Sequence, residues 1–210
     1  MLFDKIRNGI EISDKEFNLL FPESIRKQAE IHWTPFEIIQ KCAEFISQEN
    51  CKNILDIGSG VGKFCMIASA LTGAKITGIE IRKNLHFYAQ SIAHSYQLSQ
   101  VSFINQSITE TDFSPYDCFY YYNPFFENIV LENTIDTAIP LKTKAFNEYT
   151  QFVKNELEKK EKETCLISYF TSHEHIPNSY QLIEHDENLS LSFWKKQMRN
   201  EGFQEIFQEI

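Results

Sequence analysis

Residues 54–62 read Ile-Leu-Asp-Ile-Gly-Ser-Gly-Val-Gly, and residues 77–80 read Thr-Gly-Ile-Glu. The first stretch is an apolar run that leads into a glycine-rich turn, and the gap between the two has the length of a helix. This order predicts a buried strand, a turn, a helix and a second strand that ends in the acid Glu80. Ligands of open parallel sheets bind at the carboxyl ends of the strands, so the pattern predicts a nucleoside pocket at the turn.

The glycine spacing narrows the choice of ligand. Gly58, Gly60 and Gly62 follow G-x-G-x-G, whereas the dinucleotide fingerprint needs a glycine at position 63, where this chain has Lys63. A pyrophosphate must approach the helix closely, but S-adenosylmethionine has no phosphate and needs only exposed backbone at the turn. Glu80 can accept hydrogen bonds from both ribose hydroxyls. The spacing therefore favours S-adenosylmethionine over a dinucleotide.

The rest of the chain predicts an α/β fold with a Rossmann-like, mainly parallel sheet, an antiparallel C-terminal hairpin and helices on both faces. Residues 123–142 form a long connection, which is typical of a lid or binding loop or contains a further helix. Strands are expected at 53–57, 75–80, 101–106, 117–122, 164–171, 180–185 and 189–195, and helices at 63–73, 83–97 and 143–160.

Residues 1–50 read as an N-terminal helical cap on one compact cofactor-binding unit of residues 51–210. Ser13-x-x-Glu16 forms a capping box, and Thr34-Pro35-Phe36-Glu37 forms a second one with proline at the first helical position. We expect two helices to start at these boxes.

The turn, the gap and the acid together resemble the class I S-adenosylmethionine-dependent methyltransferases over roughly residues 50–195. In that family the sheet has seven strands and ends in an antiparallel hairpin. The resemblance implies that Glu80 holds the ribose, with Ile81 beside the cofactor. It places around the methionine moiety Asp56, Gly58, Ser59 and Gly60.

Many relatives have an acid after the third strand that contacts the adenine amino group. The matching position here is Ser107, which can still accept that bond, and Ile108 could flank the adenine ring. Asp112 is the alternative acid, and Ser107 as an ordinary turn residue is a third interpretation.

The fourth strand ends in Asn123-Pro124-Phe125-Phe126. Methyltransferases that act on amino groups have N-P-P-(Y/F) here, so the resemblance implies that Asn123 and the Pro124 carbonyl accept from a substrate amino group while Phe126 stacks on it. Phe125 replaces the second proline. A strand that simply ends at proline, with core aromatics, is the competing interpretation, and Tyr120 to Tyr122 are expected to face both sides of the sheet.

Residues 55–63 and 78–84 also resemble the cofactor segments of Dot-type lysine methyltransferases. The open alternatives are therefore a Dot-like protein-lysine methyltransferase, a cofactor-binding protein without transfer activity, and an aminopropyl transferase, which would need more acids near the acceptor than Asp117 alone.

Composition limits the partners. The formal charge of −9 and pI near 5.2 argue against nucleic acid and favour a small-molecule or protein acceptor. No apolar run reaches membrane length, and the five cysteines lack a C-x-x-C pair, which predicts a cytoplasmic protein without disulfides or a metal site. The loop His173-Glu174-His175, with His185 nearby, reads as polar loop rather than metal site. The oligomeric state stays open.

Overall fold

The computed structural model describes residues 1–27, 29–122 and 143–197. Before the sheet come α1 (Leu2–Arg7), α2 (Asp14–Asn18), α3 (Glu23–Arg26), α4 (Ala29–His32) and α5 (Phe36–Gln48). The parallel strands are β1 (Asn53–Ile57), β2 (Lys75–Ile79), β3 (Val101–Ile104), β4 (Cys118–Tyr122) and β5 (Cys165–Tyr169), and the hairpin is β6 (Tyr180–Asp186) with β7 (Leu191–Lys196). The remaining helices are α6 (Lys63–Thr72), α7 (Lys83–Ser95) and α8 (Thr143–Glu158), with short 3-10 turns η1 (Ile108–Glu110) and η4 (His173–His175).

The described strands form a seven-stranded sheet in the order β3-β2-β1-β4-β5-β7-β6. Strands β1 to β5 pair in parallel, while β7 is antiparallel to both β5 and β6. The predicted fold class is confirmed. In this order β1 is the middle one of the five parallel strands, so the turn that follows β1 lies at the middle of their carboxyl edge.

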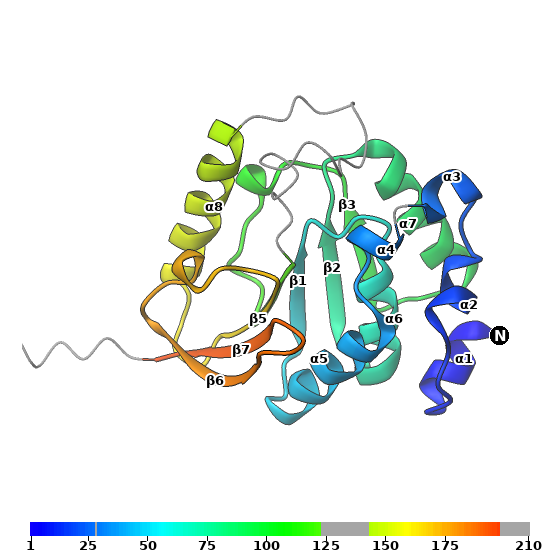
Figure 1. Cartoon of the computed structure of the whole chain (residues 1–210), viewed down its shortest axis with the longest axis horizontal. Helices are drawn as coiled ribbons and strands as arrows, with labels where there is room; N and C mark the ends of the chain where they lie inside the picture. The colour runs from blue at the N-terminus through cyan, green and yellow to red at the C-terminus, as the bar shows by residue number, and fades with distance from the viewer. Residues whose placement is uncertain (28, 123–142, 198–210) are drawn as a thin grey trace, which may run out of the picture.

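The two faces of the sheet are covered differently (Figure 1). Helices α5, α6 and α7 and the N-terminal helices cover one face, and the other is covered by α8 with the turn η1. Gly73 ends α6 in the left-handed conformation expected of a helix cap, with φ of 72°. None of the helices in the described part of the chain combines the length and apolar character needed to cross a membrane.

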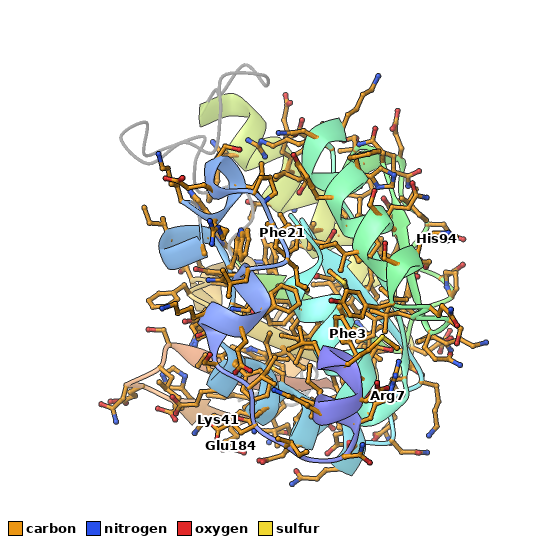
Figure 2. All side chains as sticks on the ribbon, turned by 90° about the vertical axis from the view of Figure 1, so that its right-hand side faces the viewer. Phe3, Arg7, Phe21, Lys41, His94 and Glu184 are labelled. Carbon is orange, nitrogen blue, oxygen red and sulfur yellow. The ribbon has the colours of Figure 1, made fainter. Side chains whose placement is uncertain are left out.

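The N-terminal helices pack into the main core. Phe3 of α1 and Phe21, just after α2, are 1% and 3% exposed and lie on the inner side of these helices (Figure 2). Phe3 contacts Tyr96 at the end of α7, with ring centroids 5.0 Å apart, and Phe21 contacts Trp33 at 4.9 Å. Residues far apart in sequence therefore bury one continuous apolar surface.

One of the two predicted capping boxes is confirmed and the other is wrong. Ser13 accepts from the Glu16 N–H, and the Glu16 carboxylate accepts from the Ser13 N–H. At α5 the N-cap is Pro35, and no side chain caps the helix. The Thr34 hydroxyl instead lies 2.9 Å from the hydroxyl of buried Tyr120. A buried hydroxyl needs a hydrogen-bond partner within the protein, so Thr34 bonds to Tyr120 instead of capping the helix.

Candidate functional site

The turn after β1 is built from left-handed glycines. Gly58, Gly60 and Gly62 have φ of 79°, 55° and 79°. The N–H groups of Gly58 and Ser59 donate to the Ile79 carbonyl at 3.0 and 2.9 Å, and Gly62 donates to the Ser59 carbonyl at 2.8 Å. The turn is therefore tied to the end of β2 and folded on itself. Residues with a Cβ atom disfavour the left-handed conformation, so glycine is the residue that suits all three positions.

Gly60 has a different role from Gly62 and Gly78. A Cβ built on Gly60 meets nothing within 4 Å, whereas a Cβ on Gly62 would lie 2.3 Å from the Phe103 ring. Gly78 in β2, to which sequence reasoning gave no role, would place a Cβ 2.6 Å from Ser59 Oγ. Gly62 and Gly78 thus permit close packing, while Gly60 leaves its backbone open to a ligand.

Glu80 follows β2 directly and is 5% exposed. Its carboxylate accepts from the Gly60 N–H at 3.0 Å and from the Arg82 N–H at 2.7 Å. The Asn105 side chain donates to the carbonyls of Glu80 and Ile81 at 2.7 and 3.0 Å. These bonds fix the carboxylate beside the open Gly60 backbone, and they leave Ile81 40% exposed at the same edge. Sequence reasoning missed Asn105, although a polar residue just after β3 was a usable signal.

Asp56 lies beneath the turn and is 3% exposed. The Cys65 thiol donates to its carboxylate at 3.1 Å. Burial raises the pKa of Asp56 to about 7, the bond from Cys65 opposes that rise, and the charge of nearby Glu80 adds to it. Asp56 is thus a buried acid that titrates near neutral pH.

Lys63 is the first residue of α6, and its side chain is buried. The sequence distinguishes Lys63 only as the residue that replaces the third glycine of the dinucleotide fingerprint, and it does not predict this burial. Its ammonium pairs with Asp14 of α2 at 2.5 Å, and Asp14 also accepts from the Phe36 N–H at 2.9 Å. Burial lowers the pKa of Lys63, and Asp14 opposes that effect. One carboxylate thereby joins the N-terminal helices to both α5 and the helix that follows the glycine turn.

The residues proposed for adenine hold hydrogen bonds within their own turns. Ser107 caps η1 and its hydroxyl accepts from the Thr109 N–H at 3.3 Å. Ile108 is buried in the core on the α8 face. Asp112 accepts from the N–H and hydroxyl of Ser114 at 2.8 and 2.7 Å. None of the three interpretations of this region is tested by these contacts, and the adenine roles stay predictions.

Asn123, Pro124 and Phe126 lie outside the described residues. The strand before them behaves as expected, because Tyr120 packs in the core on one face and Tyr121 in the core on the other. The Tyr120 ring stacks on Phe64 with centroids 3.7 Å apart. Tyr122 therefore marks the described end of the strand that leads to the predicted acceptor turn.

The histidines converge on a hydroxyl. His173 Nε2 and His185 Nδ1 lie 3.3 and 2.9 Å from the Ser192 hydroxyl. Among residues 1–27, 29–122 and 143–197 there is no group of three or more histidine, cysteine or acidic side chains suited to a metal ion. All five cysteines are buried and free.

Comparisons with known proteins agree with the cofactor site that the geometry of the glycine turn indicates. The model of a methyltransferase domain family matches residues 48–209. An Escherichia coli protein, yhhF, assigned as a methyltransferase has a TM-score of 0.56 and 11% identity, covering 78% of this chain and 86% of that one. An RNA methyltransferase from Salinibacter ruber, in complex with S-adenosyl-L-homocysteine, has a TM-score of 0.52 and 17% identity, covering 84% and 99%. At such identities these structures establish the fold alone.

A Geobacillus sp. (strain WCH70) protein, also assigned as a methyltransferase, is 32% identical over 87 residues. That match covers 41% of this chain and 34% of the relative, so the chain spans about a third of the length of the curated protein it matches. The predicted resemblance to methyltransferases is confirmed, and the acceptor is left open.

Proposed function

The chain belongs to a family of methyltransferase domains, whose methyl donor is S-adenosylmethionine, and we propose that it holds this cofactor over the turn 58–62. In this proposal it transfers the sulfonium methyl group to a nitrogen or oxygen atom of a small-molecule or protein acceptor. The lone pair of the acceptor atom forms a bond to the methyl carbon while the carbon–sulfur bond breaks. Sulfur keeps the electron pair, and the acceptor loses its proton to water.

The observation that carries the proposal is the joint placement of Glu80 and Gly60. The carboxylate accepts from the N–H of Gly60, which belongs to the turn, and from the N–H of Arg82, which follows β2. A carboxylate accepts several hydrogen bonds at once, so Glu80 can also receive the ribose hydroxyls. The open backbone at Gly60 and the exposed Ile81 suit the amino-acid and nucleoside ends of the cofactor.

The other predicted contacts are assigned as follows. The Ser59 hydroxyl packs toward Gly78, so we assign only the backbone of Gly58 and Ser59 to the methionine moiety. Asp56 lies below them, and its ionised form, which predominates above its pKa of about 7, can balance the ammonium group. Ser107 and the apolar Ile108 keep their proposed place at the adenine end.

Calorimetry tests the cofactor site. Titration of the wild type with S-adenosylmethionine should give a micromolar dissociation constant, and Glu80→Gln should weaken binding by roughly a hundredfold, because one isosteric change removes a charged acceptor of two hydroxyls. Glu44→Gln, on the exposed side of α5, serves as the charge-matched control and should bind as the wild type does. Thermal unfolding checks that both variants fold. Equal affinity of Glu80→Gln and wild type would rule out the ribose assignment.

The acceptor requires a separate experiment. S-adenosylmethionine labelled in the methyl group is incubated with the protein and with pools of metabolites, lysine peptides and RNA. Label in a metabolite or protein supports the proposed acceptor class, which was inferred from the net charge of −9 because a negative charge repels nucleic acid. Label in a lysine side chain would favour the Dot-like alternative. Cofactor binding without any labelled acceptor would favour a non-catalytic protein.

We also propose a cytoplasmic location. Five free cysteines, all buried, are typical of a chain that folds in a reducing compartment. Fractionation of the native cells with an antibody would test it, and recovery of the protein outside the cytoplasm would contradict it.

A further inference from the structure

Two buried carboxylates lie beside the glycine turn in different surroundings. Glu80 accepts from the N–H groups of Gly60 and Arg82 at 3.0 and 2.7 Å, and a guanidinium nitrogen of Arg82 lies 3.9 Å from its carboxylate. Asp56 accepts from the Cys65 thiol at 3.1 Å, and a thiol is a weak donor. The surroundings of Glu80 therefore stabilise a negative charge better than those of Asp56 do.

The position of Asp56 disfavours its ionised form. The residue lies in β1 and is 3% exposed, and its neighbours in the sheet are Gly78 of β2 and Tyr120 of β4. In the described part of the chain no lysine, arginine or histidine forms an ion pair with Asp56, and the charge that acts on it is the carboxylate of Glu80. Burial and a like charge both favour the neutral acid, so Asp56 is the member of the pair that retains a proton.

The other titratable side chains around Asp56 do not respond near neutral pH. Among the described residues they are the thiols of Cys42 on α5 and Cys65 on α6, and the phenol of Tyr120 on β4. Burial raises the pKa of each of these three groups, so all of them stay protonated between about pH 5 and about pH 8. Glu80 is held as a carboxylate, and Asp56 is therefore the group that can exchange a proton here.

The place of Asp56 in the chain relates it to the positive end of the cofactor. Asp56 lies two residues before the turn 58–62, whose backbone we assign to the methionine moiety. The ammonium group of that moiety brings a positive charge to the turn, and a cation beside a carboxylic acid favours its ionised form. A ligand that favours one protonation state shifts the protein toward that state.

We propose that Asp56 carries a proton in the ligand-free protein and releases it when the ammonium end of the cofactor binds. The inference rests on the proposed cofactor site and goes beyond it, because it makes cofactor affinity depend on pH. The O–H bond of the carboxyl group breaks, the electron pair stays on oxygen, and the proton passes to water or buffer. Affinity therefore rises as the pH approaches about 7 and levels off above it.

Calorimetry with S-adenosylhomocysteine tests this coupling. Affinity should be roughly tenfold higher at about pH 7.5 than at about pH 6, because only about a tenth of the free protein has Asp56 ionised at the lower pH. Titrations in two buffers with different ionisation enthalpies count the protons. Close to one proton should be released for each ligand bound at about pH 6.

Methylthioadenosine is the matched control ligand. It keeps the adenine, the ribose and the thioether sulfur but lacks the amino-acid end, so it brings no ammonium group to the turn. Its affinity should be the same at both pH values, and its binding should release no proton. This comparison uses the wild type and holds even if a variant of Asp56 fails to fold. An equal pH response of the two ligands would overturn the proposal.

Two variants assign the proton to one residue. Asp56→Asn cannot titrate, so it should bind S-adenosylhomocysteine with the same affinity at both pH values and release no proton. Glu44→Gln removes an exposed acid from α5 and should keep the response of the wild type. Thermal unfolding checks that both variants fold. A response of wild-type size in Asp56→Asn would contradict the assignment.

The two proposals fail in different ways. If S-adenosylhomocysteine bound at neither pH, the proposed cofactor site and the role of Asp56 would both be wrong. If it bound with an affinity independent of pH and released no proton, the cofactor site would stand and the role of Asp56 would be overturned.

Discussion

The carboxyl edge of the sheet has two ends that differ in how deeply their side chains are buried. At the β1–β2 end the side chains of Glu80 and Asp56 are almost fully buried, and their carboxylates accept hydrogen bonds of 2.7 to 3.1 Å. At the β4–β5 end the side chain of Phe170 is 54% exposed, on a left-handed backbone with φ of 48°. The first end thus holds its carboxylates in a fixed geometry, whereas the second presents an apolar ring to solvent.

The largest expected effect concerns packing at the cofactor end. Gly62→Ala should destabilise the protein by about 2 to 5 kcal/mol, because it combines a left-handed alanine with overpacking against the Phe103 ring. Gly60→Ala places its Cβ in open space, so it should lower the free energy of unfolding by only about 1 to 2 kcal/mol. It should still weaken the binding of the cofactor. Urea unfolding measures both. Equal losses for the two variants would mean that the glycines do not have separate roles.

Asp56 makes the stability of the cofactor end depend on pH. Its folded pKa of about 7 lies above the value of about 3.9 in an unfolded chain. The fold therefore favours the neutral acid, and its stability should fall as pH rises from about 4 to about 7 and then level off. The loss should reach about 1 to 3 kcal/mol relative to Asp56→Asn, which lacks this slope. Unfolding at several pH values would contradict this reasoning if wild type and variant had parallel profiles.

The Asp14–Lys63 pair tests how the N-terminal helices support the glycine turn. Asp14→Asn leaves the buried ammonium of Lys63 without its carboxylate and should lower stability by about 1 to 3 kcal/mol, less than for a fully buried pair because Asp14 is half exposed. The more exposed Lys41–Asp186 pair is the matched control, and Asp186→Asn should change stability by less than about 1 kcal/mol. A larger loss from Asp186→Asn than from Asp14→Asn would reverse this interpretation.

The smallest effect is expected in the contact beneath β4. Thr34→Val leaves the buried Tyr120 hydroxyl without its partner and should cost about 1 to 2 kcal/mol. The double variant Thr34→Val with Tyr120→Phe should be more stable than Thr34→Val alone, because both polar groups are then removed. Thermal unfolding of the set measures the coupling, and strictly additive losses would show that the two hydroxyls do not interact.

The two ends also differ in what the sequence could reveal. Local spacing predicts the cofactor end, because the glycines and Glu80 carry their signal within a single strand-turn-helix-strand unit. The contacts Asp14 with Lys63 and Thr34 with Tyr120 join residues 49 and 86 positions apart, so no local pattern contains them. The same holds for the ring contact between Tyr122 and Tyr169, which forms only when β4 and β5 pair. The left-handed backbone at Phe170 has no local signal either, because phenylalanine is not a residue that favours it.

A crystal structure of the complex with S-adenosylhomocysteine tests the central claim most directly. The account predicts that both ribose hydroxyls lie within about 3.2 Å of the Glu80 carboxylate and that the amino-acid end contacts the backbone of Gly58 to Gly60. A ligand bound elsewhere, or a ribose held by other groups while Glu80 contacts only the protein, would contradict it.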